Sequence, residues 1–436
     1  MRHLLFCWLL VSPLLLAAQT GIRFHSPGDV FSYADSHSAT FKNATQQNIL
    51  AKYQTMAAKL AQWNVQGDAT FTATDNTKLP TNFLPAQIFG GEPGKFQPIT
   101  LGQKYVTAIV FNPQIDILNP YAAAKVQLSK ANEQLTTLNN LLTKKSLYES
   151  IAAAYYNIQS YYWQANITRQ SLLVADTLTQ IMLNKQQQGI ARSQDVNNAQ
   201  ANQLATQDKL QQLEVQLAQQ YYSLKLLCDI NPDSVVVLTD TLLPEPAFDA
   251  SMVPAGHLQQ QQTLQQQRYQ EADLRAEKRW FMPTLSFVGY LAWQQNTNNA
   301  FFDNTRWLGA NYVGLKLKMP LLPDANKVAA VKYARINLVV ANTNAQHAAL
   351  QDSISNRQLG LDYQKAYSSY RLAQKVAVLK QDSYYKNLNI YREGILSATD
   401  MLNSFSDWLN SSLNTAAQLA GSEYQKTKIQ INNTIQ

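Results

Sequence analysis

Residues 121–188 read YAAAKVQLSKANEQLTTLNNLLTKKSLYESIAAAYYNIQSYYWQANITRQSLLVADTLTQIMLNKQQQ. This run lies between Pro120 and Gly189 and contains neither glycine nor proline. A second run, between Pro323 and Gly394, is interrupted by a single glycine. A continuous α-helix over either run would be roughly 100 Å long, at about 1.5 Å per residue. Helical patterns of this length are typical of coiled coils, so the sequence predicts two very long, paired helices.

The spacing of apolar residues within both runs supports coiled-coil packing. Leu128, Leu135 and Leu142 recur every seven residues in the first run, as expected of one seam between packed helices. In the second run one seam is predicted to contain Val340, Leu350, Ile354 and Leu361, with His347 packed among them.

Four strand signals precede the long runs in two pairs, at residues 65–74, 105–111, 285–293 and 312–319. The last is the clearest, because Val313, Leu315 and Leu317 alternate with Tyr312, Lys316 and Lys318. Alternation over about ten residues is what a membrane-spanning strand needs, but any half-buried sheet shows it too. Within each pair, residues 75–104 and 296–307 are predicted to be exposed loops.

The two halves of the chain repeat each other. Tyr105-Val106 corresponds to Tyr312-Val313, an offset of 312 − 105 = 207 residues. Gly189-Ile190 corresponds to Gly394-Ile395, an offset of 394 − 189 = 205. Each half therefore reads as helix, strand, strand, very long helix, glycine turn and helix. The repeats are predicted at 19–230 and 257–436 with a linker at 231–256, and the shorter helices at 36–63, 194–228, 257–280 and 398–431.

Stacked end to end, the two shorter helices of each half would together roughly match the length of one long helix. That arrangement would place the strands at one end of a rod and the two glycine turns at the other.

The first 18 residues are predicted to be a secretory signal. Arg2 and His3 precede an apolar run at residues 4–16, and Ala17 and Ala18 supply small residues for cleavage. The remaining chain has one cysteine and therefore no intrachain disulfide. No later stretch has 18 consecutive apolar residues, so the sequence leaves two alternatives: a soluble exported protein, or one that crosses a membrane as strands.

The charge distribution indicates no nucleic-acid partner. The formal net charge of the 436-residue chain is +7, but its basic residues are scattered and form no Lys/Arg block. No His/Cys/Asp/Glu group has metal-ligand spacing, and the sequence has neither a nucleophile motif nor a phosphate-binding glycine loop. We therefore expect no enzymatic activity, no metal and no cofactor.

The duplicated turns are the most specific motifs of the sequence. They span Gln188–Val196 and Tyr391–Leu402, and two further matches are the segment joining the halves, from Leu224 to Pro246, and Pro283–Ser286 before the third strand. In these motifs the chain resembles the TolC-like outer-membrane efflux proteins over nearly its whole mature length. Cys228-Asp229 departs from the small residue more usual in that family, so a different local turn is expected there.

The resemblance implies a mainly α-helical fold with membrane β-strands. The long antiparallel coiled-coil helices would form an α-barrel, and four strands per protomer would contribute to a twelve-stranded β-barrel in a homotrimer. It also implies a passive export duct in the outer membrane that extends into the periplasm and is gated at the helical tips. Its partners would be outer-membrane lipid, a periplasmic adaptor and an inner-membrane pump, in tripartite efflux or type I secretion. The alternative is a soluble periplasmic coiled-coil protein with a structural or adaptor role.

Several residues are candidates for the gate. Asp195 and Asp400 follow the turn glycines. Their carboxylates either stabilise the positive N-terminal ends of the helices that they begin, or form rings near a constriction in the trimer. Tyr391 matches an aromatic residue that helps to hold the gate closed in the family. Leu396 stands where the family has a basic gate residue, which leaves Arg192 and Arg392 as candidate substitutes.

The remaining candidates lie in the turns and in the last strand. Gly189 and Gly394 are predicted to end their helices with positive φ, and the resemblance implies that these tips, with Ile190 and Ile395, contact the adaptor. Lys316 and Lys318 would face the lumen of a membrane barrel, because charges on the lipid face are costly; the alternative is the solvated face of an ordinary sheet.

Overall fold

A computed structural model of the chain describes residues 21–242, 256–304, 306–322 and 324–435. The predicted signal at residues 1–18 and residues 243–255 of the predicted linker lie outside this description. The chain forms two compact units. The first, here called the turn unit, comprises Met1–Gln46, Leu138–Gln260 and Ala348–Gln436. The second, the sheet unit, comprises Gln47–Thr137 and Gln261–His347.

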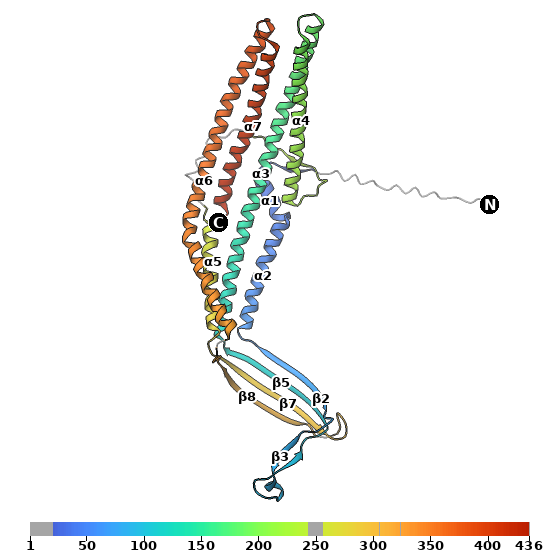
Figure 1. Cartoon of the computed structure of the whole chain (residues 1–436), viewed down its shortest axis with the longest axis vertical. Helices are drawn as coiled ribbons and strands as arrows, with labels where there is room; N and C mark the ends of the chain where they lie inside the picture. The colour runs from blue at the N-terminus through green and yellow to red at the C-terminus, as the bar shows by residue number, and fades with distance from the viewer. Residues whose placement is uncertain (1–20, 243–255, 305, 323, 436) are drawn as a thin grey trace, which may run out of the picture. The chain divides into compact units, whose positions relative to one another are not determined.

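Seven helices account for most of the described residues, and the two predicted long helices are confirmed. Both contain 68 residues, and Figure 1 shows each followed by a shorter antiparallel helix, α3 by α4 and α6 by α7. None of the described helices is long and apolar enough to span a membrane. The bounds are α1 Pro27–His37, α2 Ala39–Ala61, α3 Pro120–Gln187, α4 Ser193–Cys228, α5 Leu258–Arg279, α6 Ala325–Arg392 and α7 Ala398–Thr434.

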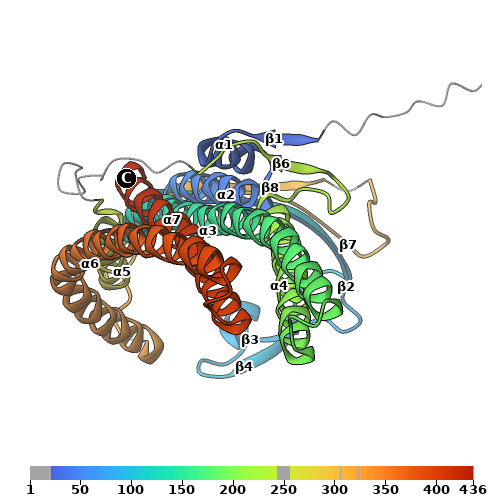
Figure 2. The ribbon, with the colours of Figure 1, turned by 90° about the horizontal axis from the view of Figure 1, so that it is seen from above.

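The first predicted helix, at residues 36–63, is wrong in two respects. The helical segment begins earlier, at Pro27, and it is broken into two helices, α1 and α2, at Ser38. Ser26 caps α1 by accepting a hydrogen bond from the backbone N–H of Asp29, and this helix ends where Ser38 adopts an extended conformation at φ −62° and ψ 132°. Nearby, β1 (Ile22–Phe24) pairs in parallel with β6 (Val236–Leu238), two strands that the sequence pattern did not reveal. Figure 2 shows α1, β1 and β6 gathered on one side of α3.

Within the turn unit, the end of one shorter helix contacts the start of the next at two junctions. At the first junction Asp229, with φ 52° and ψ 42°, ends α4 in a left-handed conformation. Its carboxylate also accepts a hydrogen bond from the backbone N–H of Ala39 at the start of α2. The departure at Cys228-Asp229 therefore has a structural role, because one aspartate terminates one helix and caps the next.

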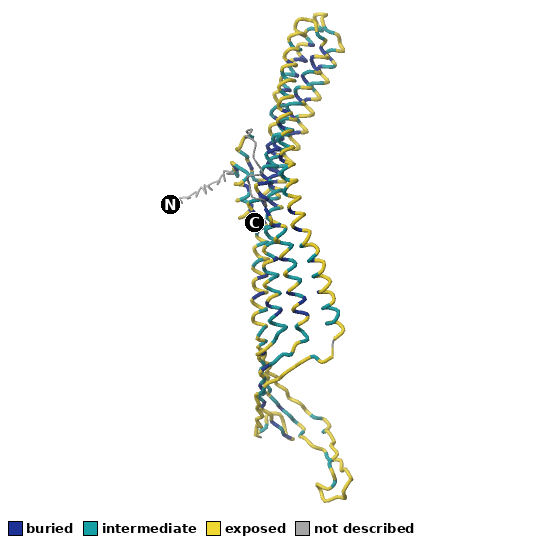
Figure 3. Tube along the Cα trace, turned by 90° about the vertical axis from the view of Figure 1, so that its left-hand side faces the viewer, coloured by how far each residue is buried: buried dark blue, intermediate teal, exposed yellow. Residues whose placement is uncertain are grey.

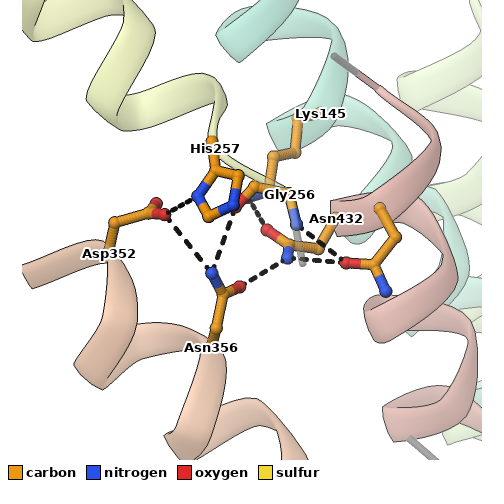
Figure 4. A network of polar contacts seen from close by, with 7 residues as sticks. Lys145, Gly256, His257, Asp352, Asn356 and Asn432 are labelled. Carbon is orange, nitrogen blue, oxygen red and sulfur yellow. Dashed lines mark hydrogen bonds and ion pairs between the residues drawn. The ribbon is translucent and has the colours of Figure 1, made fainter. Parts of the chain in front are cut away.

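At the second junction α7 ends against the start of α5. The N–H of Gly256 donates to Oδ1 of Asn433 at 3.1 Å. Beside it, Asn356 of α6 receives a hydrogen bond from Asn432 at 2.8 Å and donates one to the carbonyl oxygen of Gly256 at 3.1 Å (Figure 4). His257 Nδ1 lies 2.6 Å from Asp352 Oδ2. This polar network joins α6 to the end of α7 and to the start of α5.

The four predicted strands form one antiparallel sheet in the order β2-β5-β7-β8. Their bounds are β2 Gln66–Asp75, β5 Tyr105–Leu118, β7 Thr284–Thr297 and β8 Leu308–Lys318. The two central strands contain 14 residues each and are longer than the sequence predicted. The predicted loop at 75–104 is partly wrong, because it contains a second hairpin, made of β3 (Thr81–Pro85), a 3₁₀ turn η1 (Ala86–Phe89) and β4 (Phe96–Thr100).

The predicted seam in α6 is not buried within one chain. Val340, Leu350 and Leu361 are each more than half exposed, and His347 is exposed as well, so its predicted packing is wrong for the single chain. Apolar residues at helical spacing that remain exposed need another surface to cover them.

Three helices of the sheet unit are joined by one buried carboxylate. Glu277 of α5 lies 3.0 Å from Lys125 Nζ of α3 and 3.5 Å from Lys327 Nζ of α6. Burial alone would raise the pKa of Glu277, but hydrogen bonds and the charges of both lysines outweigh it and hold this pKa below its ordinary value.

A Glu277→Gln variant is expected to unfold at a lower temperature than the wild type at neutral pH. The substitution removes the negative charge that faces the two half-buried lysines, Lys125 and Lys327. Its loss is expected to lower the free energy of unfolding by about 1–3 kcal/mol. Because the folded-state pKa is lowered, this stability is present above the unfolded-state pKa of the carboxyl and is lost as the pH falls through its folded-state pKa. Thermal unfolding of both proteins over a pH series should show the difference shrinking in acid. A difference that does not depend on pH would contradict this role of the ion pairs.

Candidate functional site

The sheet has two chemically different faces. Pairing across the four strands, together with the alternation of side chains along each, places residues of the same parity on one face. Large apolar side chains share one face and are exposed there: Phe71, Ile109, Phe111, Ile115, Phe287, Trp293, Val313, Leu315 and Leu317. Most polar side chains share the other: Asp68, Thr70, Thr72, Thr74, Asn112, Gln114, Asp116, Ser286, Gln294, Asn296, Lys316 and Lys318.

Lys316 and Lys318 therefore lie on the polar face, opposite Val313, Leu315 and Leu317, as the alternation predicted. Both lysines are exposed. Tyr290 and Tyr312 stack on this face as a cross-strand pair with ring centroids 5.2 Å apart.

Both outer strands of the sheet have an open edge. β2 pairs only with β5 and β8 only with β7 among the described strands. Every residue of β2 is exposed, and so is every residue of β8 except Gly314. In Figure 3 exposed backbone predominates among the strand segments of the sheet unit. Unpaired edges next to a large exposed apolar face are unfavourable for an isolated chain in water.

A buried aspartate fixes the end of the sheet next to the helices. Asp116 is 3% exposed, and its carboxylate accepts hydrogen bonds from Ser286 at 2.7 Å, Asn119 at 2.9 Å, Gln114 at 3.1 Å and Asn64 at 3.2 Å. Gln114 lies on β5 itself and Ser286 on the adjacent strand β7, whereas Asn64 lies between α2 and β2 and Asn119 between β5 and α3. The sequence pattern did not single out Asp116, although a carboxylate in a strand just before a helix-starting proline is a usable signal.

The two glycine turns of the turn unit have the same geometry. Gly189 has φ 75° and Gly394 has φ 81°, as predicted. The N–H of Gly189 donates to the carbonyl oxygen of Gln186 at 2.9 Å, and that of Ile190 donates to the carbonyl oxygen of Lys185 at 2.8 Å. The equivalent pair of bonds around Gly394 measures 3.0 and 3.1 Å. Both turns are Schellman motifs, in which a side chain at the glycine would be strained.

The isoleucines after the turn glycines are the most exposed apolar residues of these turns. Ile190 is 69% exposed and Ile395 is 75% exposed. In a Schellman motif this position often packs on the preceding helix, so its exposure here leaves an apolar tip on each turn.

Both candidate gate aspartates are engaged at the starts of their helices. The carboxylate of Asp195 accepts a hydrogen bond from the backbone N–H of Arg192 at 3.1 Å. Asp400 accepts one from the hydroxyl of Ser397 at 2.6 Å, and that hydroxyl accepts one from the N–H of Asp400 at 3.1 Å. This is the helix-start role that the sequence allowed; rings of carboxylates stay a prediction.

Tyr391 connects the two long helices of the turn unit. It is buried, and its hydroxyl donates to Sδ of Met182 at 3.1 Å and accepts from Nζ of Lys185 at 3.2 Å. The lysine Nζ also lies 4.2 Å from the centroid of the tyrosine ring, a cation–π distance. The basic side chain that contacts Tyr391 is thus Lys185. Arg192 and Arg392 are exposed, and their candidate role in the gate stays a prediction.

The sequence itself carries a signal for Lys185. It lies one helical turn before Gly189, where a basic residue favours the negative end of a helix. The internal repeat could not indicate it, since the corresponding position of the second half is Ile390.

The tyrosine belongs to a compact apolar core that joins the helical hairpins α3–α4 and α6–α7. Its buried members come from all four helices: Ala175, Leu178, Met182, Val196, Ala199, Tyr384, Tyr391, Ala398, Met401, Leu402 and Phe405. Tyr384 and Trp408 stack there with ring centroids 5.3 Å apart. Any separation of the two hairpins must break this core.

The folds of several outer-membrane proteins match this chain. The Campylobacter jejuni CmeC outer membrane channel matches with a TM-score of 0.76 and 15% identity, over 94% of this chain and 85% of that one. The Vibrio cholerae outer membrane protein VceC matches at 0.72 and 15%, over 92% and 94%. The open-state Neisseria gonorrhoeae MtrE outer membrane channel matches at 0.69 and 13%, over 92% and 88%.

No protein-family model matches this sequence, and neither does any curated protein. At these identities the likeness establishes the fold, and the chain has the fold of outer-membrane channels along nearly its whole length. The predicted mainly helical fold with four strands in one chain is confirmed, as is the resemblance to TolC-like proteins in fold. The α-barrel and the twelve-stranded trimeric β-barrel stay predictions.

Proposed function

We propose that this protein is a passive outer-membrane channel that acts as a homotrimer. The observation that carries the proposal is the open sheet, with two unpaired edges, one apolar face and one polar face. Pairing β8 of one chain with β2 of the next would remove the edges and, in three copies, close a twelve-stranded barrel. Its apolar face would then meet lipid and its polar face a water-filled lumen.

Two further apolar stripes in the sheet unit support assembly with other copies. On α2 the side chains of Leu50, Tyr53, Met56 and Leu60 are each more than half exposed and recur every three or four residues. On α6 the same holds for Tyr333, Ile336 and Val340. Helical stripes of this kind pack on neighbouring helices, which is how an α-barrel of several chains would be built.

The tips and the path through the channel complete the proposal. The turns with Ile190 and Ile395 would contact a periplasmic adaptor that connects to an inner-membrane pump, in efflux or type I secretion. The core around Tyr391 and Lys185 would hold the channel closed, with Asp195 and Asp400 near its constriction. The channel would use no cofactor and would catalyse no reaction. The energy for transport would come from the inner-membrane pump.

The location and assembly of the full chain test this function. With its own N-terminal segment, the protein should be recovered in outer-membrane fractions as a trimer that dissociates on heating in detergent. Release with the periplasmic contents on osmotic shock would instead favour the soluble coiled-coil alternative. A monomer in the membrane fraction would contradict the closed barrel.

Replacing both lumen candidates by acids, as Lys316→Glu with Lys318→Glu, is expected to shift ion selectivity toward cations by about twofold or more. Three chains would carry six such residues around the polar interior. Reversal potentials in planar bilayers under a salt gradient measure the shift. The matched control, Lys316→Arg with Lys318→Arg, keeps the charge and should leave the reversal potential in place. If the glutamate variant forms trimers with unchanged selectivity, these lysines do not face the lumen.

A further inference from the structure

The β3–β4 hairpin carries an apolar face that its own chain does not cover. Its register pairs Phe83 with Pro98 and Pro85 with Phe96, and these four side chains lie on the same face. All four are exposed, with Phe83 at 67% and Phe96 at 65%. The hairpin pairs with no other described strand.

Such a hairpin is poorly stable by itself. A two-stranded sheet is marginal in water and needs further strands or a packed face. On the other face of the hairpin, Leu84 and Ile99 are already half-buried. The face with the two phenylalanines is therefore where additional packing would stabilise this part of the chain.

The sequence of the hairpin disfavours growth by strand addition. Pro85 and Pro98 lie within its two strands and supply no backbone N–H. Prolines on edge strands oppose pairing with a further strand. The partner is therefore expected to contact the aromatic face and not the strand edges.

The charge of the hairpin favours an identical partner. Between Leu79 and Gln103 the only charged residues are Glu92 and Lys95, and their side chains form an ion pair with each other at 2.6 Å. The segment is thus neutral, so copies brought together would not repel. A neutral surface also has little attraction for the anionic surface of a membrane or for a strongly charged protein.

We propose that this face is a contact between copies of the chain, in which three β3–β4 hairpins pack on one another through Phe83 and Phe96. The inference rests on the proposed trimer. In the sequence, the hairpin lies between β2 and β5, which are neighbours in the main sheet. At its base the backbone N–H of Asn76 donates to the carbonyl oxygen of Lys104 at 2.7 Å. Closure of the barrel would therefore gather three hairpins around one axis.

Single cysteines in the full-length trimer test the contact. The native cysteines add little background, because Cys228 is buried and Cys7 lies in the predicted signal, which is removed on export. Mild oxidation of a Phe96→Cys variant is expected to link two of the three chains of each trimer into a covalent dimer. The matched control is Asn82→Cys, on the opposite face of the same hairpin, which should give several-fold less dimer. A Phe83→Ser with Phe96→Ser variant should form trimers that dissociate at a lower temperature.

The outcomes separate this inference from the proposed function. An intact trimer in which Phe96→Cys forms no more dimer than Asn82→Cys would overturn the hairpin contact and leave the channel proposal standing. Failure to find any trimer would overturn the channel proposal first. An adduct with another protein, or protection of Phe96→Cys from a soluble maleimide only when lipid vesicles are present, would identify a different occupant and also overturn the contact.

Discussion

A Tyr391→Ala variant is expected to conduct several-fold more current than the wild type when trimers are reconstituted in planar bilayers. The substitution removes a buried ring from the core that joins the α3–α4 and α6–α7 hairpins, at a cost of about 3–5 kcal/mol. It also removes the contacts with Met182 and Lys185. With the hairpins less firmly joined, open arrangements of the tips should become more populated.

Two milder variants identify which contact matters. Tyr391→Phe keeps the ring and loses the hydroxyl, while Lys185→Met keeps the length of the side chain and loses its charge. If the pair acts as one unit, each single change should have a smaller effect than the alanine variant, and the effect of the double variant should be clearly smaller than the sum of the two single effects. Trimer content is measured in parallel. A Tyr391→Ala trimer with wild-type conductance would exclude this core as the gate.

The Gly256→Ala variant is expected to unfold at a markedly lower temperature than the wild type. A Cβ at this position would lie 1.8 Å from the carbonyl oxygen of Asn432 and 2.8 Å from its carbonyl carbon. These are backbone atoms, so the end of α7 must move away from the start of α5. Overpacking of this severity costs about 3 kcal/mol and should also disturb the bond from Gly256 to Asn433.

The unfolding temperature of the purified protein measures this effect, and Gly360→Ala is the matched control. Gly360 lies inside α6, where an added Cβ meets no atom within 4 Å. There alanine should stabilise the helix by up to about 1 kcal/mol. Equal unfolding temperatures for Gly256→Ala and the wild type would show that the end of α7 can move away from the start of α5 with no loss of stability.

The regular elements were predictable from local sequence patterns. Glycine and proline positions bounded the two 68-residue helices, and alternation located all four strands of the main sheet. Both patterns depend on the period of a side chain along its own element. The glycines of both turns followed as well, because a helix ended by a left-handed residue strongly favours glycine.

The sequence by itself therefore determined the helix–turn–helix and strand elements, their duplication and the positive φ of Gly189 and Gly394. Tertiary structure alone decided which side chains meet. It brought Lys185 to Tyr391 across 206 residues, collected four donors around Asp116, and placed Asp229 at the start of α2. It also showed that the seam of α6 is uncovered in one chain. The physical reason is that periodicity fixes the face on which a residue lies, whereas the partner of that face depends on how distant elements pack.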